Sequence, residues 1–180
     1  MKFFSFWRSL ASFRVRIALN LKNLPADIVL VDLDTDAHRA DDYRRINPQM
    51  ALPSLIEDDG TVLFQSLAIL EYLEETHPTP PLLPADPRGR ARVRALALMV
   101  ACEGHLAGNK DTGRFCHGDT PTMADICMVG HVTVAITQQI DLAPWSTVKR
   151  IFETAMALPE FAKAHPLAQP DTPEAMRPKK

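Results

Sequence analysis

The sequence predicts two domains, an α/β domain of element order βαβαββα followed by a domain built only of helices. Three observations predict this fold class. Two runs rich in β-branched and aromatic residues, 2–7 and 27–33, flank a segment with helical spacing. Residues 77–86 are then too dense in proline for a helix or a central strand. Beyond them the composition favours helices alone.

The first three elements form a β-α-β unit. Residues 11–22 carry Val15, Ala18 and Leu19 on one face at helical spacing, so we expect a helix there. Asn23-Leu24-Pro25 provides the signal that ends it. A crossover of this kind makes the two flanking strands parallel neighbours in one sheet.

The rest of the first domain follows from shorter patterns. The polar residues 37–46 are expected to form a short helix. Residues 54–57 and 61–64 are two strands separated by Asp58-Asp59-Gly60, which predicts a hairpin. Residues 66–76 place their apolar side chains on one face and complete the domain as a helix.

The second domain is predicted to contain four helices. The first spans 88–106, the second begins near Thr122, and two more span 146–157 and 159–165. Thr122-Met123-Ala124-Asp125 has the spacing of a capping box, which marks a helix start.

We therefore expect a first domain at residues 1–77, a linker at 78–87, a helical domain at 88–166 and a mobile tail at 167–180.

Composition excludes several classes of protein. With a net charge of −2 and no basic run beyond Arg177 to Lys180, no surface suits a nucleic acid, so we expect no such partner. No apolar stretch reaches the roughly 20 residues of a membrane span, and no secretory signal is recognisable, which together favour the cytoplasm. The cysteines, like the histidines, lack metal-ligand spacing, so we expect buried thiols, no disulfide and no metal site.

The most informative stretch begins at Ser9, directly after the apolar run that ends at Trp7. A helix start exposes unpaired backbone N–H groups and positive potential, which suit an anion or a thiolate. The hydroxyls of Ser9 and Ser12 can donate into that space, and Arg8 and nearby arginines add positive charge. An ordinary helix cap with solvated arginines fits this stretch alone equally well.

The whole chain resembles the glutathione transferases, and within them the zeta-like maleylacetoacetate and maleylpyruvate isomerases. The resemblance implies a thioredoxin-like first domain and a helical second domain, with glutathione as cofactor. It rests on these segments: F-W-R-S-L-A-S-F-R-V-R-I-A-L-N-L-K, N-P-Q-M-A-L-P-S-L, Q-S-L-A-I-L-E-Y-L, P-L-L-P-A-D-P, R-A-R-V-R-A-L, G-D-T-P-T-M-A-D-I-C and A-H-P-L-A-Q-P-D.

The resemblance implies a role for several residues near the helix start. Ser9 matches the serine that hydrogen-bonds the glutathione sulfur, and Ser12 is the second candidate hydroxyl. Arg8 matches an arginine that faces the substrate, where a guanidinium can hold a carboxylate by paired hydrogen bonds. Lys110 lies near a position where the family carries a further arginine. Arg8 is also compatible with a simple surface cation.

Glutathione contacts are implied elsewhere in the first domain. Leu52-Pro53 resembles the cis-proline corner, where backbone groups bind the cysteinyl part of glutathione as an added strand would. Gln65-Ser66 matches the pair that receives the γ-glutamyl end, with Gln49 alongside. Without these neighbours, Gln65-Ser66 reads as a helix cap.

Two further contacts are implied in the second domain. His105 and Asn109 fall where the family's helix approaches glutathione. His105 fits equally well as a histidine satisfied at a helix end.

The chain departs from the family pattern in three places. Leu10 and Ala11 replace polar residues beside the serine. At residues 109–113 the chain continues directly into the next segment, whereas the family inserts further helical sequence there. That sequence helps to wall the substrate pocket, and its absence corresponds to about 30 residues, or two or three average helices. Ile136-Thr137 replaces an arginine pair.

Two functions are therefore open. One is a glutathione-dependent cis-trans isomerase, in which the thiolate adds to the conjugated double bond of a small unsaturated keto acid, the bond rotates and the thiolate leaves. The other is a glutathione transferase of relaxed scope acting on an electrophile, or a non-catalytic glutathione-binding homologue. The resemblance also implies a homodimer.

Overall fold

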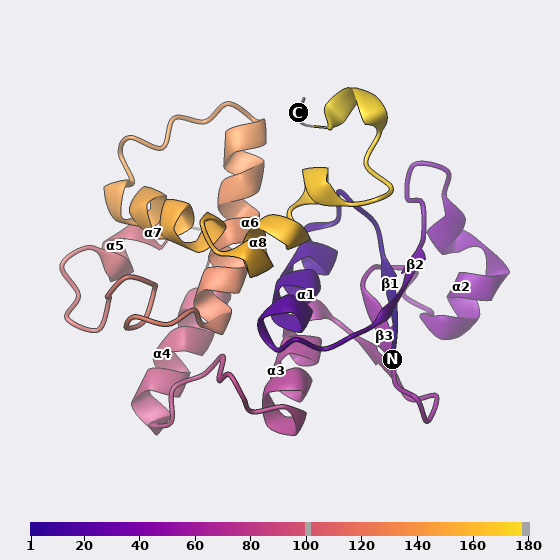
Figure 1. The fold of residues 1–180 in the computed structure, drawn as a ribbon, viewed down its shortest axis with the longest axis horizontal. Helices are drawn as coiled ribbons and strands as arrows, with labels where there is room; N and C mark the ends of the chain where they lie inside the picture. The colour runs from indigo at the N-terminus through magenta and orange to yellow at the C-terminus, as the bar shows by residue number, and fades with distance from the viewer. Residues whose placement is uncertain (100–101, 178–180) are drawn as a thin grey trace. The chain divides into compact units, whose positions relative to one another are not determined.

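The computed structural model describes residues 1–99 and 102–177, and its contacts divide the chain into two compact units (Figure 1). The first unit contains Met1–Thr76 together with the described part of Lys163–Lys180, and the second is His77–Ala162. The start of the second unit lies at the proline-dense segment. The last part of the chain differs from the expected free tail, because it groups with the first unit.

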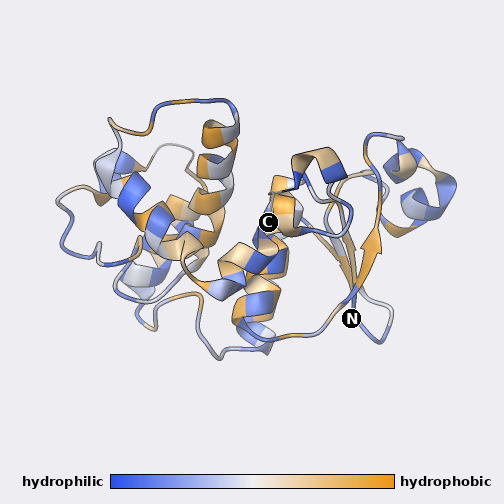
Figure 2. Ribbon diagram, turned by 45° about the horizontal axis from the view of Figure 1, so that its top comes forward, coloured by the Kyte–Doolittle hydropathy of each residue, from blue (hydrophilic) through white to orange (hydrophobic). Residues whose placement is uncertain are grey.

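The first unit is built around a four-stranded mixed sheet in the order β2-β1-β3-β4. The β1 and β2 strands pair in parallel, as the β-α-β unit predicted, and β3 and β4 form the predicted antiparallel hairpin. Hydrophobic colour runs along the strands in Figure 2. The strands are β1 (Lys2–Ser5), β2 (Asp27–Leu30), β3 (Ser54–Ile56) and β4 (Val62–Phe64).

The first helix, α1 (Leu10–Leu21), has a defined cap at each end. Ser9 is the N-cap, and its side chain accepts a hydrogen bond from the Ser12 backbone N–H. At the other end Asn23 has a φ of 51°, which asparagine tolerates. The Leu24 N–H then donates to the Leu19 carbonyl at 2.9 Å. This is the Schellman arrangement, and it explains why the helix stops where the sequence predicted.

Two other helical segments complete the first unit's α/β part. The expected helix at 37–46 is divided into η1 (Ala37–Arg39) and α2 (Asp41–Ile46). Ala40 separates them because its backbone is extended, with φ −63° and ψ 149°. The helix α3 (Ser66–Thr76) packs against α1, and a buried ion pair of 3.0 Å joins Lys22 to Glu74.

The second unit is helical, but its first helix is shorter than predicted. The prediction of one helix over 88–106 was wrong, since α4 ends at Ala97 and a separate short helix, α5, starts at Glu103. Residues 100–101 of that prediction lie outside the described residues. The helices are α4 (Pro87–Ala97), α5 (Glu103–Leu106), α6 (Met123–Thr137), α7 (Ser146–Met156) and α8 (Pro159–Ala164), which crosses the unit boundary.

The capping box predicted at Thr122 is present at the start of α6. The Asp125 carboxylate is fully buried and accepts hydrogen bonds of 2.8 Å from the backbone N–H groups of Thr122 and Cys116 and from the Thr122 hydroxyl. It therefore fixes both the helix start and the loop before it.

All three cysteines, Cys102, Cys116 and Cys127, are buried, as expected, and the structure places none of them in a disulfide. Burial raises the pKa of the Cys102 and Cys116 thiols. Of the helices in the described chain, none combines the length and the apolar character needed to cross a bilayer.

Candidate functional site

Ser9 lies at the point where β1 and the turn after it lead into α1. Its Oγ accepts the Ser12 N–H at 3.2 Å, while its own N–H donates to the Phe6 carbonyl at 3.1 Å. With the oxygen acting as acceptor inside the turn, the hydroxyl proton is available to a ligand. The side chain is partly exposed at the positive end of a 12-residue helix.

Ser12 does not occupy the position that the sequence suggested. Its side chain is fully buried, with 0% exposure, among the buried residues of α1 such as Phe13 and Val15. Ser12 Oγ has no hydrogen-bond partner among the described residues. The contribution of Ser12 to the site is therefore its backbone N–H, which orients the Ser9 hydroxyl.

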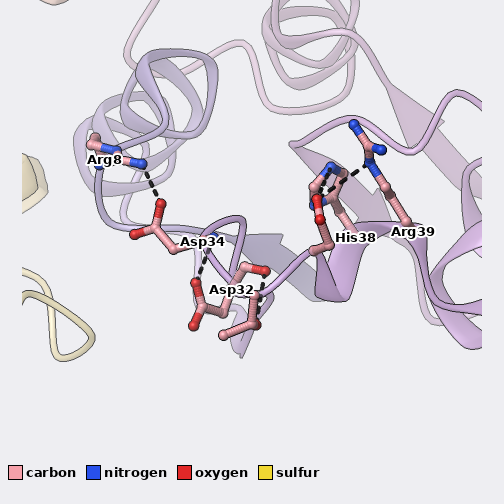
Figure 3. Close-up of polar contacts among 7 residues, drawn as sticks. Arg8, Asp32, Asp34, His38 and Arg39 are labelled. Atoms are coloured by element: carbon pink, nitrogen blue, oxygen red, sulfur yellow. Dashed lines mark hydrogen bonds and ion pairs between the residues drawn. The ribbon is translucent and has the colours of Figure 1, made fainter.

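Arg8 is exposed and pairs with Asp34, which follows β2 (Figure 3). The guanidinium carbon also lies 5.7 Å from the ring centre of Phe6 and 5.8 Å from that of Trp7. A carboxylate thus already occupies the guanidinium that was expected to face the substrate. Ion pairs this exposed contribute about 0–1 kcal/mol, so a second carboxylate can displace Asp34 at low cost.

The loop before β3 carries Gln49 and the Leu52–Pro53 peptide bond, which is cis as the resemblance implied. Buried polar groups brace this loop. Asn47 Nδ2 donates to the Ala51 carbonyl at 2.9 Å, and Asn47 Oδ1 accepts the Gln49 N–H at 3.1 Å. The hydroxyl of Tyr43, another buried residue, donates to the Ala51 carbonyl at 2.7 Å.

Gln65 and Ser66 lie where β4 leads into α3. Gln65 has a φ of 69°, a left-handed conformation that costs about 1–3 kcal/mol in residues other than glycine and is often found at ligand sites. Its side-chain Nε2 donates to Gln49 Oε1 at 3.0 Å. The Ser66 hydroxyl accepts from the Arg14 guanidinium at 3.4 Å. The structure thus brings Gln49, Gln65 and Ser66 together beside a helix start.

Arg16 was expected to add positive charge near the site, but it points into the core and is 4% exposed. Burial lowers its pKa to about 10, while Asp171 opposes that shift. Sequence reasoning did not find Asp171, whose Oδ2 accepts the Trp7 N–H at 2.8 Å. The only signal is its place at the end of A-H-P-L-A-Q-P-D, a segment whose last five residues were expected to belong to the mobile tail.

His105, Asn109 and Lys110 belong to the second unit, which is not placed relative to the first. His105 is exposed in α5, and its carbonyl accepts from Arg92 at 3.3 Å. Asn109 Oδ1 accepts the Asp111 N–H at 2.9 Å and closes a turn, and Lys110 is exposed. Their contacts with a ligand stay predictions.

The second unit also contains a cavity of about 230 Å³ beside α6. Its lining is mainly apolar and includes Val132, Ala135, Ile140 and Trp145. Across residues 1–99 and 102–177, no group of three or more His, Cys, Asp or Glu side chains could hold a metal ion.

Comparison with known proteins gives one consistent result. Residues 8–76 match the model of the glutathione S-transferase N-terminal domain. The chain is 38% identical to the maleylpyruvate isomerase of a Ralstonia species, with 96% of this chain and 100% of that protein covered. It is 37% identical to the maleylacetoacetate isomerase of Pseudomonas aeruginosa, with 97% and 100% covered.

Solved structures agree with the sequence matches. A holo structure of maleylpyruvate isomerase, a bacterial zeta-class glutathione S-transferase, superposes with a TM-score of 0.91 at 38% identity and covers 96% of this chain and 100% of its own. Maleylacetoacetate isomerase from Methylobacterium extorquens, with bound malonate and glutathione, gives 0.92 at 41% identity, again with 96% and 100% covered.

The relatives are longer than this chain. The alignment with the Ralstonia protein spans 212 residues, whereas this chain has 180, so the relative carries positions with no counterpart here. The expectation that these positions belong to a helical segment after residue 109 stays a prediction. The matches, the thioredoxin-like unit with its helical companion, and the Ser9 turn establish that the chain belongs to the zeta-class glutathione transferases, the family of the maleylacetoacetate and maleylpyruvate isomerases.

Proposed function

We propose that the protein binds glutathione in its first unit and uses it to isomerise the cis double bond of a small unsaturated keto acid, such as maleylacetoacetate or maleylpyruvate. The observation that carries this proposal is the arrangement of the first unit. Ser9 lies at the start of α1, and the Gln65–Ser66 pair lies at the start of α3. Each is held by hydrogen bonds within the protein, and each keeps N–H or O–H donors that a ligand can use.

The donor set of the first unit fits glutathione. The start of α3 suits a free carboxylate of glutathione, because three kinds of donor lie there. They are the backbone N–H groups of the first helical turn, the Gln65 amide, and the Arg14 guanidinium, which contacts Ser66. The peptide part suits the backbone beside Leu52–Pro53, since such pairing needs no particular side chain. The sulfur suits the Ser9 hydroxyl.

The bound thiolate would supply the nucleophile that adds reversibly to the conjugated double bond and so permits rotation. The protein's contribution is to keep that sulfur ionised and to hold the acid. The Ser9 hydroxyl donates to the thiolate, and the dipole of α1 favours the negative charge. Arg8 exchanges Asp34 for a carboxylate of the substrate and thereby orients it.

The test is a comparison of Ser9→Ala with the unmodified protein. We expect glutathione binding by calorimetry and isomerisation of maleylpyruvate or maleylacetoacetate, with kcat reduced about 10- to 100-fold in Ser9→Ala. That range corresponds to one hydrogen bond to a charged group, worth about 1.5–3 kcal/mol.

Ser9→Ala also removes the N-cap of α1, so it needs a matched control. Asp86→Ala removes the N-cap of α4, where Asp86 accepts the Gly89 N–H at 2.8 Å, and touches no proposed site residue. Both variants should lose about 1 kcal/mol of stability. Equal kcat values in the two variants would contradict the role of Ser9.

A second candidate function has its own support. The relatives carry positions that this chain lacks. The resemblance also implies arginines where the helical unit has Ile136-Thr137 and near Lys110. These differences favour a transferase of relaxed scope or a glutathione-binding protein without isomerase activity. Turnover of a chlorinated aromatic acceptor without isomerisation would favour the first form, and binding without any turnover the second.

We also propose a cytoplasmic homodimer. Three buried cysteines that form no disulfide suit a reducing compartment. Exposed apolar side chains on the second unit, including Leu98 and Ile136, offer surface for a second copy. Size-exclusion chromatography with light scattering measures the oligomeric state directly.

A further inference from the structure

The C-terminal segment, residues 163–177, returns to the turn that carries Arg8 and Ser9. Figure 1 draws it in yellow beside the start of α1. The Asp171 carboxylate accepts the Trp7 N–H at 2.8 Å, although the two residues are 164 positions apart in the chain. The His165 ring packs edge-on against Phe13, with centroids 5.9 Å apart. The segment is thus attached to the site turn and to the helix behind it.

Arg16 holds the same turn from the inside. One end of its guanidinium donates to the Phe6 carbonyl at 3.2 Å and the other to the Trp7 carbonyl at 3.1 Å. Its Nε donates to the Ala164 carbonyl at 2.9 Å. Because a guanidinium is planar and rigid, these bonds fix the two carbonyl groups relative to the C-terminal segment.

The backbone of the turn is therefore held on both of its polar sides. Asp171 takes the Trp7 N–H, and Arg16 takes the carbonyl groups of Phe6 and Trp7. Ser9 comes two residues after Trp7, and no regular sheet pairing holds the chain between the end of β1 and the start of α1. If the backbone at Trp7 can move, the Ser9 hydroxyl, two residues further along the chain, moves with it.

We propose that Asp171, acting together with Arg16, is a positioning residue that fixes the Trp7–Ser9 turn and so places the Ser9 hydroxyl against the glutathione sulfur. The inference rests on the proposed function and extends it to a segment far from the site in sequence. Misplacement of a reacting or stabilising group by about 1 Å can cost on the order of 100-fold in rate. The position of the turn therefore affects the chemistry, beyond its effect on stability.

The experiment compares Asp171→Ala with two matched variants. Asp171→Asn keeps an oxygen acceptor for the Trp7 N–H. Thr172→Val damages the same segment without touching the turn, since the buried Thr172 hydroxyl donates to the Pro166 carbonyl at 2.7 Å. Each variant is measured for amide hydrogen exchange by NMR, for ionisation of bound glutathione by its ultraviolet thiolate absorbance, and for kcat and KM.

Asp171→Ala should speed exchange of the Trp7, Arg8 and Ser9 amides at least tenfold and raise the pKa of the bound thiol. Its kcat should fall about tenfold with little change in KM. Asp171→Asn should stay close to the unmodified protein in all three measurements. Thr172→Val should lower Tm to a similar extent as Asp171→Ala but leave the turn amides and the thiol unchanged.

Equal exchange rates and thiol ionisation in Asp171→Ala and Thr172→Val would overturn the inference, since Asp171 would then only fasten the segment. If the unmodified protein neither binds nor ionises glutathione, the proposed function fails, and the exchange rates still decide whether Asp171 positions the turn. Should Asp171→Ala not fold, Arg16→Lys takes its place. Arg16→Lys keeps the positive charge but removes the paired N–H donors of the guanidinium. It should therefore speed hydrogen exchange of the same three amides.

Discussion

The two units differ in what their buried polar residues support, although each unit leaves some large apolar side chains exposed, among them Ile28 and Phe64 in the first. In the first, two of the three segments that carry the proposed site are braced by a buried polar residue, Asn47 behind the Leu52–Pro53 loop and Arg16 behind the Ser9 turn. In the second, the end of α6 and the segment after it leave large apolar side chains 39% to 48% exposed, namely Val134, Ile136, Ile140 and Trp145.

The sequence of α6 sharpens the contrast. It is apolar around its whole circumference, which is typical of a helix buried on all sides, yet its last turns face solvent. The family relatives carry additional positions that this chain lacks. The first unit thus keeps buried polar support behind the segments of the proposed site, whereas the last turn of α6 in the second unit is left open to solvent.

The largest expected effect is in the second unit. Asp125→Ala leaves the donors of Thr122 and Cys116 without their buried acceptor, so we expect a loss of about 3 kcal/mol in the free energy of unfolding. Amide protection should fall in α6 well before it falls in α1. Thr122→Val, which removes only the hydroxyl, should cost about 1 kcal/mol. Simultaneous loss of protection in both helices would contradict an energetic separation of the units.

The next effect is in the first unit. Asn47→Ala removes the bonds to the Ala51 carbonyl and from the Gln49 N–H, so it should cost about 1–3 kcal/mol and weaken glutathione binding about tenfold. Tyr43→Phe removes the hydroxyl bond to the same carbonyl and should have a smaller effect on both. Calorimetric titration measures the affinity. A destabilised Asn47→Ala that binds glutathione with unchanged affinity would mean that the loop does not shape the site.

A smaller effect is expected at the exposed Arg8–Asp34 pair. Asp34→Asn frees the guanidinium, so the KM for a carboxylate substrate should fall about two- to fivefold, with stability changed by less than about 0.5 kcal/mol. Asp36→Asn is the control, because Asp36 pairs with Arg39 and carries the same charge nearby. If both variants shift KM equally, the shift comes from the loss of one negative charge near the site. The proposal that Arg8 binds the substrate carboxylate would then be contradicted.

The smallest effect is expected on the exposed end of α6. Ile136→Ser should change Tm little, since the side chain is 47% exposed, whereas Ile126→Val in the buried part of the same helix should cost about 1 kcal/mol. Light scattering on Ile136→Ser measures whether the substitution changes the oligomeric state. A marked drop in Tm together with dissociation would show that a second copy of the chain covers the C-terminal end of α6.

Local patterns were enough to predict the parallel pairing of β1 with β2, the helix α1 and the β3–β4 hairpin, because each depends on residue periodicity and on turn residues such as Asn23. They did not predict that β3 pairs with β1 to join the two pieces into one sheet. They failed at α4, since helix-favouring residues continue past Ala97 and no local signal marks the end. For the site, Ser9, Gln65 and the Leu52–Pro53 bond were expected from motifs, and the structure gives each a defined place in the first unit.

The bracing of the site could not be predicted. Arg16 stands in a helix with other arginines and looks like a solvated cation, and its acceptors include the distant Ala164 carbonyl. Asp171 lies 164 positions from Trp7. Periodicity and spacing describe neighbours within a few turns, so pairings over such separations emerge only when the chain is folded.

The burial of Cys102, Cys116 and Cys127 has a consequence for a protein proposed to handle an activated sulfur compound. Disulfide exchange and oxidation proceed through the thiolate, and burial disfavours the thiolate of Cys102 and Cys116 by raising the pKa of both groups. In the native state these side chains should therefore form no mixed disulfides with the tripeptide and resist alkylating reagents. On this expectation, sulfur chemistry on the bound tripeptide would proceed without side reactions at Cys102 and Cys116.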